Sequence, residues 1–299
     1  MKRILVTGKN GQVGWELQRS LAAFGEIIAL DSDSMDLADP DAIRRTIREV
    51  RPDIIVNPAA YTAVDKAESE MELANAVNGI APGVLAEEAK LLGAILVHYS
   101  TDYVFDGSKP APYVESDVPN PQSVYGRTKL AGEQAVRASG CKHLIFRTSW
   151  VYGVHGGNFV KTMLRLARER NELRIVADQF GAPTWAKDIA NSTATALHNW
   201  QQLAWDDRLS GLYHLTAAGR TNWHQFAETI IREARKYDTA LAAKTIAVNP
   251  IATHEYPLPA KRPVNSVLAN DKVRNAFGIA MPEWQDSLVE CVRLLYAQP

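Results

Sequence analysis

Cysteine is scarce in this chain: among its 299 residues the only two cysteines are Cys141 and Cys291. They lie far apart and form no Cys-x-x-Cys motif, which argues against a disulfide framework and against a cysteine-based zinc site. The seven histidines are scattered, without the spacing of metal ligands. We therefore expect no metal site from these side chains and a reduced, cytoplasmic setting.

Long hydrophobic runs and an excess of one charge are also missing. No stretch approaches the roughly 18 apolar residues of a membrane span, and the apolar run near the N-terminus is too short for the core of a signal peptide. The formal net charge of −1 gives no electrostatic reason to expect nucleic acid or an anionic membrane as a partner. The sequence therefore predicts a soluble protein with neither kind of partner.

What the sequence does contain is a regular alternation of strand-like and helix-like segments. This alternation predicts an α/β fold with a Rossmann-type, doubly wound parallel sheet. The expected strands are 4–6, 26–30, 53–57, 94–100 and 143–149, and the expected helices are 11–24, 40–50, 64–92 and 125–138. Ligands of such sheets bind beyond the carboxyl ends of the strands, which here lie after Val6, Asn57, Ser100 and Ser149.

Three glycines follow the first expected strand. In TGKNGQVG, Gly8, Gly11 and Gly14 stand at three-residue intervals before a helix, where glycine lets a pyrophosphate approach the backbone at the helix N-terminus. A glycine triplet alone can mark a mere turn, but Asp31 also ends the next strand, where a carboxylate meets an adenosine ribose. The pattern predicts a dinucleotide site in which Asp31 favours NADH, while Arg3 or Lys9 could fold back and admit NADPH.

The second half of the chain is less regular. Helices are expected at 158–170, 185–203, 223–236 and 284–296, and a proline-rich stretch, PLPAKRP, spans 257–263. No flexible linker separates the halves. We expect a dinucleotide-binding domain at 1–150, joined by later segments, and a smaller C-terminal α/β substrate lobe at 151–299 that closes over it.

A tyrosine and a lysine stand four residues apart in SVYGRTKLAGE. Tyr125 and Lys129 therefore share one face of a helix, although such a pair taken alone is more often structural. Thr101, just beyond an expected strand, would hold a substrate oxygen, and the Lys129 ammonium would lower the pKa of the Tyr125 phenol. Together with the glycines, these residues predict hydride transfer between a carbonyl and an alcohol.

At these residues the sequence resembles the extended short-chain dehydrogenase/reductases, and more closely the dTDP-4-dehydrorhamnose reductase family. The resemblance covers nearly the whole chain. It rests on GKNGQVGWELQ, VNPAAYTAVDKAE, HYSTDYVFDG, VYGRTKLAGE, FRTSWVYG, NFVKTMLRLA, DQFGAPT and RPVNS.

The resemblance implies an activity and a set of site residues. The activity is NADPH- or NADH-dependent reduction of the C4 ketone of dTDP-4-dehydro-L-rhamnose, the last step of dTDP-rhamnose synthesis for cell-surface polysaccharide. Tyr125 would protonate the developing alkoxide, Lys129 would orient the nicotinamide ribose, and Thr101 would bind the reacting oxygen. The candidate cofactor contacts are Gly8, Gly11, Gln12, Val13, Gly14, Asp31, Asp36, Leu37, Ala60, Tyr61, Thr62, Tyr99, Tyr125 and Lys129. The candidate contacts to the dTDP-sugar are Thr101, Asp102, Trp150, Lys261 and Arg262, although the last two could also be a solvated loop.

One departure from the family concerns magnesium. Glu16 matches a glutamate through which some relatives share a magnesium ion between subunits, but Lys187 stands where they have a second glutamate. An ammonium cannot ligate a cation, so the sequence argues against a magnesium-bridged dimer and predicts a monomer or weak homodimer. Two other activities stay open: a dinucleotide-binding regulatory subunit of the kind found beside methionine adenosyltransferase, and a sister reductase that gives dTDP-6-deoxy-L-talose. The complete set of Thr101, Tyr125 and Lys129 argues against the regulator.

Overall fold

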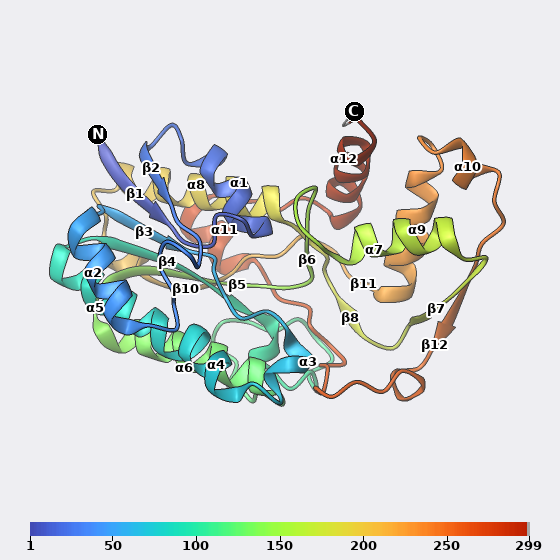
Figure 1. Cartoon of the computed structure of the whole chain (residues 1–299), viewed down its shortest axis with the longest axis horizontal. Coiled ribbons are helices and arrows are strands. Elements are labelled where there is room, and N and C mark those ends of the chain that lie inside the picture. The colour runs from blue at the N-terminus through green and yellow to red at the C-terminus, as the bar shows by residue number, and fades with distance from the viewer. Residues whose placement is uncertain (298–299) are drawn as a thin grey trace.

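The computed structural model describes residues 1–297 and contains a six-stranded sheet in one half of the molecule (Figure 1). The strands are β1 (Lys2–Val6), β2 (Gly25–Ala29), β3 (Ile54–Asn57), β4 (Ile95–Thr101), β5 (Lys142–Thr148) and β10 (Gly211–His214). They pair in the order β10-β5-β4-β3-β1-β2, and every pair is parallel. Because the order reverses between β1 and β3, the ends of these two strands form the switch point at which ligands bind in such sheets. The predicted doubly wound parallel sheet is confirmed.

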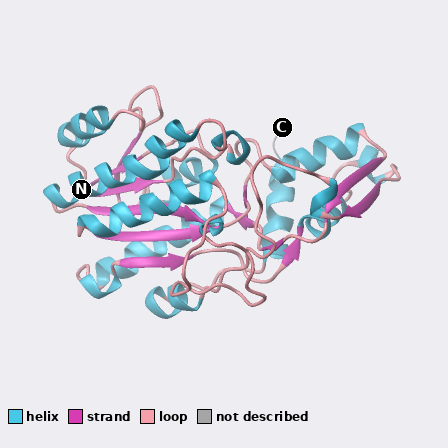
Figure 2. Cartoon of the chain, turned by 90° about the horizontal axis from the view of Figure 1, so that it is seen from below, coloured by secondary structure: helices cyan, strands magenta, loops and turns pink. Residues whose placement is uncertain are grey.

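Helices cover both faces of this sheet (Figure 2). Along β1 the buried side chains alternate: Ile4 and Val6 belong to the core of one face, and Leu5 belongs to the core of the other. On the first face lie α1 (Gln12–Ser20), α8 (Ala186–Gln202) and α11 (Asp271–Phe277), and on the second lie α2 (Pro40–Val50), α5 (Ala81–Leu92) and α6 (Val124–Ser139). Strands with apolar side chains on both faces require this two-sided cover.

The helical region predicted at 64–92 is present but interrupted. The segment is broken into α3 (Val64–Ala67), α4 (Met71–Asn75), a π-helical turn (Ala76–Ile80) and α5. Within the π-helical turn the buried Asn78 side chain accepts a hydrogen bond from the Tyr61 amide and donates one to the Tyr61 carbonyl. A π-helical turn re-aims one side chain inside a helix, and here that side chain fixes the loop after β3.

The smaller half of the molecule has its own core. Phe226 is fully buried there, together with residues of α7 (Phe159–Glu169), α9 (Trp223–Ala234) and α12 (Trp284–Ala297). Its short strands are β6 (Val151–Tyr152), β7 (Glu172–Val176), β8 (Phe180–Gly181), β9 (Thr184–Trp185), β11 (Thr221–Asn222) and β12 (Ala247–Ile251), and its remaining helix is α10 (Thr239–Ala242). The strand pairs are β7 with β12, β6 with β9, and β8 with β11.

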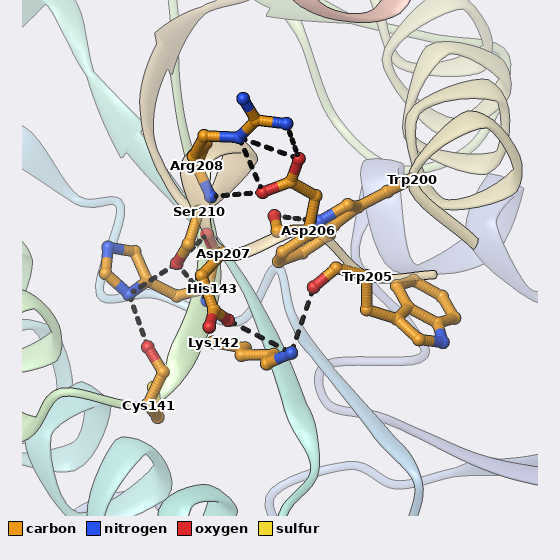
Figure 3. A network of polar contacts seen from close by, with 9 residues as sticks. All are labelled: Cys141, Lys142, His143, Trp200, Trp205, Asp206, Asp207, Arg208 and Ser210. Atoms are coloured by element: carbon orange, nitrogen blue, oxygen red, sulfur yellow. Dashed lines mark hydrogen bonds and ion pairs between the residues drawn. The ribbon is translucent and has the colours of Figure 1, made fainter. Parts of the chain in front are cut away.

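A polar network fastens the segment that leads into β10 to the neighbouring strand β5 (Figure 3). The Lys142 ammonium donates to the Trp205 carbonyl at 2.9 Å and lies 3.0 Å from the Asp207 carboxylate. The His143 amide donates to the Ser210 hydroxyl, which donates back to the His143 carbonyl. Because α8 and β10 thus return to the first sheet, we propose that later segments complete the dinucleotide-binding domain of residues 1–150, and that the rest of 151–299 forms the smaller lobe.

None of the helices in residues 1–297 is long and apolar enough to cross a membrane. Cys141 and Cys291 are both buried thiols.

Candidate active site

A cavity of about 590 Å³ opens at the carboxyl edge of the large sheet. Its lining comes from the ends of β1, β2, β3 and β4, from α6, and from the segment after β6. Of the predicted site residues, those that line it are Gly8, Gly11, Gln12, Val13, Gly14, Asp31, Asp36, Leu37, Ala60, Thr62, Tyr99, Tyr125 and Lys129. The structure therefore brings all the predicted cofactor residues except Tyr61, and two of the three predicted catalytic residues, to one place.

The glycines form a tight turn between β1 and α1. Gly8 has a φ of +58°, and a Cβ on it would lie 2.9 Å from the Cβ of Ala59. A Cβ on Gly14 would lie 2.1 Å from the Gly8 carbonyl oxygen. Gly11 precedes α1 and supplies no side-chain cap, so the first amides of this helix face the cavity without a capping oxygen from that residue. This arrangement suits a pyrophosphate, which binds to backbone amides and to the positive end of the helix dipole.

The Asp31 carboxylate, just after the second strand, forms an ion pair with Lys9 and accepts hydrogen bonds from Ser34. The Lys9 ammonium lies 2.8 Å from it, and Ser34 donates to it through both its hydroxyl and its amide. The hydrogen bond to Lys9, followed by that to Ser34, holds the pKa of Asp31 well below its usual range. Arg3, the other cation considered from the sequence, instead lies 3.9 Å from Glu26 at the opposite end of the strands. Lys9 is therefore the cation that can balance Asp31.

Tyr125 and Lys129 lie on α6 with their side chains in the cavity. The helix begins after Ser123, whose hydroxyl accepts a hydrogen bond from the Gly126 amide. The Lys129 ammonium is buried and donates to the Tyr99 carbonyl at 2.6 Å. An ammonium has three donors, so Lys129 keeps others for a ligand.

The expected lowering of the Tyr125 pKa by Lys129 is not found. Burial raises the pKa of Tyr125 to about 12, and the nearby Thr101 hydroxyl counteracts this only in part. Burial also lowers the pKa of Lys129 to about 8, against the opposing effect of Glu133. The phenol is therefore protonated at neutral pH and can donate a proton, as a reduction requires.

Thr101 and Asp102 directly follow Ser100, which lines the cavity, but do not line it themselves. Thr101 ends β4, and its hydroxyl donates to the Asp102 carboxylate at 3.0 Å. Asp102 is 3% exposed, and its Oδ2 has no hydrogen-bond partner among the described residues. Burial raises the pKa of Asp102 to about 6. A buried carboxylate oxygen without a donor is costly, so Asp102 is ready to accept a hydrogen bond from a ligand hydroxyl.

Tyr61 and Trp150 do not line this cavity. The Tyr61 hydroxyl donates to Glu70 at 2.5 Å, so its side chain turns away from the cavity lining. Trp150, with a φ of +48°, stacks on Trp223 at 3.7 Å between ring centroids. Its ring lies against Gly181, where a Cβ would come within 2.6 Å of it.

Lys261 and Arg262 behave differently from each other. Lys261 is exposed, whereas Arg262 is half-buried and donates two hydrogen bonds of 2.7 Å to the two oxygens of Asp65. The two residues of the predicted basic cluster therefore differ: the Arg262 charge is paired with Asp65, whereas Lys261 is exposed.

Sequence reasoning missed the loop after β6. Gly156 and Gly157 line the cavity, and His155 in the same loop stacks on Trp15 at 4.2 Å between ring centroids. The Asn158 side chain donates to Gln12 in the glycine turn at 3.0 Å. The run of glycines in GVHGG is a signal for such a loop, but only the folded chain brings it to residues about 145 positions earlier.

These residues fit a nicotinamide dinucleotide. The site has room where Cβ atoms at Gly8 and Gly14 would clash, amides for a pyrophosphate, a carboxylate for a ribose and a buried ammonium for the second ribose. Residues 1–297 contain no group of three or more His, Cys, Asp or Glu side chains arranged to hold an ion. Lys187, which stands where a metal ligand was considered, has its ammonium 5.0 Å from the centre of the Trp185 ring.

Comparison with known proteins agrees with this geometry. The family model described as RmlD substrate binding domain matches residues 1–297. The chain is 51% identical to the dTDP-4-dehydrorhamnose reductase of Burkholderia thailandensis, over 99% of this chain and 100% of the relative. Two solved structures are also similar. One is the dTDP-4-dehydrorhamnose reductase of Clostridium acetobutylicum, with a TM-score of 0.88, 40% identity and coverage of 98% and 99% of the two chains. The other is that of Bacillus anthracis in complex with NADP, with a TM-score of 0.87, 38% identity and the same coverage. The chain therefore belongs to the RmlD substrate binding domain family, whose members named here are dTDP-4-dehydrorhamnose reductases.

Proposed function

We propose that this chain reduces the C4 ketone of dTDP-4-dehydro-L-rhamnose to the alcohol of dTDP-L-rhamnose, with NADPH or NADH as the hydride donor. The identity of 51% over the whole length of a named reductase carries the proposal. The phenol of Tyr125 and the ammonium of Lys129 in one cavity support it, because a regulator has no need of a proton donor.

Each of the candidate catalytic residues then has a defined role in this reaction. A bound reduced nicotinamide supplies the hydride. Tyr125 gives its phenolic proton to the oxygen at C4 as that oxygen gains negative charge. Lys129, held by the Tyr99 carbonyl, donates to the nicotinamide ribose. Thr101 holds the reacting oxygen beside Tyr125, and Asp102 accepts from a sugar hydroxyl.

The remaining predicted contacts belong to the same proposal. The glycine turn, with Gln12 and Val13, holds the pyrophosphate, and Asp31 meets the adenosine ribose. Asp36, Leu37, Ala60 and Thr62 line the dinucleotide, with Tyr61 contributing through its backbone. Trp150, Lys261 and Arg262 face the sugar nucleotide.

We also propose a cytoplasmic location, since the substrate is a nucleotide sugar, and a monomer or weak homodimer without a shared metal. The product would supply cell-surface polysaccharide. The sister reductase that forms dTDP-6-deoxy-L-talose differs only in the face of C4 that receives the hydride.

The test is the loss of reduced-nicotinamide absorbance when the protein meets dTDP-4-dehydro-6-deoxyglucose and its 3,5-epimerase. We expect oxidation that depends on the epimerase, and the configuration of the isolated product names it as rhamnose or talose. Tight cofactor binding without any turnover would instead favour the regulatory subunit.

A prediction follows from the ion pair of Lys9 and Asp31. Lys9→Ala is expected to weaken NADPH binding about tenfold, as for loss of one charged hydrogen bond, while NADH binding changes little. Without Lys9, the Asp31 carboxylate would face the 2′-phosphate of NADPH unbalanced. Titration of each cofactor, followed by nicotinamide fluorescence, measures both dissociation constants. Arg3→Ala is the matched control, and equal weakening by both variants would contradict the role of Lys9.

A second prediction concerns Arg262. If this guanidinium binds the diphosphate of the substrate, Arg262→Met raises KM for the dTDP-sugar by at least about tenfold and leaves cofactor affinity unchanged. Asp65→Asn, which releases Arg262 from its partner, should not raise this KM. If both variants raise KM equally, the pair has a structural role and Arg262 is not a substrate ligand.

A further inference from the structure

Beneath the cavity lies a buried ion pair to which no role has been given so far. Glu133, on α6, is 1% exposed and Arg147, on β5, is 2% exposed. Arg147 donates to both oxygens of Glu133, at 2.8 Å from Nε and 2.6 Å from Nη2. The Ser100 hydroxyl, whose residue lines the cavity, donates to the same carboxylate at 2.5 Å. The pair therefore reaches the wall of the candidate active site.

The pairing register of the strands explains how Glu133 and Arg147 link α6 to β4 and β5. Ser100 on β4, Arg147 on β5 and His214 on β10 are Cα partners across neighbouring parallel strands. Glu133 lies four residues after Lys129 on α6, and Lys129 lies four after Tyr125, so the three share one helix face. Glu133 thus ties the face of α6 that carries the catalytic candidates to the ends of two strands.

Burial of such a pair needs a reason other than stability. Removing two charges from water costs several kcal/mol per ion, and a buried pair is often no more stabilising than apolar residues of similar volume. Here the Nη1 of Arg147 even lacks a hydrogen-bond partner among residues 1–297, and the guanidinium packs over the Phe105 ring at 5.0 Å. The desolvation cost of the Glu133–Arg147 pair is therefore more readily explained if the pair holds neighbouring residues in position.

We propose that Glu133 and Arg147 are positioning residues that hold α6 against β4, so that the Lys129 ammonium stays on the Tyr99 carbonyl and faces the cavity. The proposal rests on the proposed function, in which Lys129 contacts the nicotinamide ribose. Ser100 is the direct link, because its hydroxyl joins the residue after Tyr99 to the Glu133 carboxylate. Neither Glu133 nor Arg147 lines the cavity.

The pair also acts on Lys129 through charge. The titratable groups around this ammonium are Tyr125 and Glu133 on its own helix and His98 and Tyr99 on β4. The Arg147 guanidinium on β5 is paired with Glu133. His98 is fully buried and hydrogen-bonded to Asn57 through Nδ1, and burial holds its pKa well below the usual value, so it is neutral. Burial raises the pKa of Tyr99, which is neutral as well. Glu133 is then the negative charge that opposes the loss of the Lys129 proton.

The decisive variant is Glu133→Gln, which keeps the shape and removes the charge. We expect its dissociation constant for NADPH, measured without sugar, to rise about tenfold, the size of one displaced charged hydrogen bond. We also expect the pH at which NADPH affinity falls to move to lower values, because Lys129 loses its proton more easily without Glu133. A purely structural role would not move this pH dependence.

Two further variants keep the test decisive if Glu133→Gln unfolds. Glu133→Leu with Arg147→Met replaces the pair by apolar groups, which is expected to preserve folding but not NADPH affinity. Glu88→Gln is the matched control, because the Glu88 carboxylate is also buried and bound by two nitrogens of one arginine, Arg48, but lies away from the cavity. It should change the melting temperature and leave NADPH affinity unchanged.

Either of two results would overturn the proposal: full NADPH affinity in the apolar double variant, or equal loss of affinity in Glu88→Gln. Because these measurements use no sugar, they are separate from the turnover test. If the wild-type chain binds NADPH but reduces no dTDP-sugar, the proposed function is refuted. The positioning role of Glu133 and Arg147 is still tested by the NADPH affinities of the variants.

Discussion

Replacing Tyr125 with phenylalanine is expected to lower kcat about a thousandfold, because loss of a general acid costs about 10²–10⁴ in rate. The substitution removes one oxygen and leaves the ring, which packs edge-to-face on Tyr103 with the centroids 5.5 Å apart. NADPH affinity should therefore remain within a small factor of the wild type. Steady-state oxidation of NADPH gives kcat, and fluorescence titration gives the dissociation constant.

The pKa of Tyr125 adds a pH dependence to this prediction. Since burial raises that pKa to about 12, Tyr125 stays protonated through the neutral and mildly alkaline range and does not itself cause a loss of activity there. An alkaline decline in wild-type activity should instead follow Lys129, whose pKa is about 8.

Tyr103→Phe is the control for Tyr125. It removes a phenol that packs against the same ring but does not line the cavity. We expect its kcat to stay close to that of the wild type. Equal losses in the two variants would mean that the rate depends on packing of the aromatic pair and that Tyr125 is not the proton donor.

Helix α2 shows why much of the fold could be predicted from the sequence. The predicted helix at 40–50 matches α2 at Pro40–Val50. Asp39 caps it by accepting from the amides of Asp41 and Ala42, Pro40 occupies the first turn, and Arg51 ends it in the left-handed region. All of these signals are local, so no knowledge of the folded chain was needed to find them.

The errors arose where distant parts of the chain meet. The helical region predicted at 64–92 contains a π-helical turn whose Asn78 side chain reaches back to Tyr61, a contact that no periodicity reveals. The pairing of Arg262 with Asp65 joins residues 197 positions apart. The pKa of Tyr125 was expected to be lowered by the lysine one turn away, but burial raises it instead. Charge partners and burial are properties of the packed molecule, and the spacing of residues alone does not determine them.

The largest effect on cofactor binding is expected from Gly14→Ala. A Cβ at this position would lie 2.1 Å from the Gly8 carbonyl oxygen and 2.9 Å from its carbonyl carbon, so the backbone of the turn must move. Overpacking of this kind costs about 1–3 kcal/mol of stability, and displacing the amides that face the pyrophosphate should weaken NADPH binding about a hundredfold. The melting temperature and the dissociation constant together measure both effects.

Gly11→Ala separates backbone overlap from a general sensitivity of the glycine turn. Its Cβ would meet only the Gly8 carbonyl oxygen, at 3.3 Å, which a shift of a few tenths of an ångström can relieve. We therefore expect a much smaller loss of NADPH affinity and a melting temperature near that of the wild type. If Gly14→Ala binds NADPH normally while folded, the pyrophosphate does not lie on this turn and the cofactor must bind elsewhere in the cavity. If instead both variants lose affinity equally, any side chain in the turn is excluded by the ligand itself, and the contact between Gly8 and Gly14 is not what limits binding.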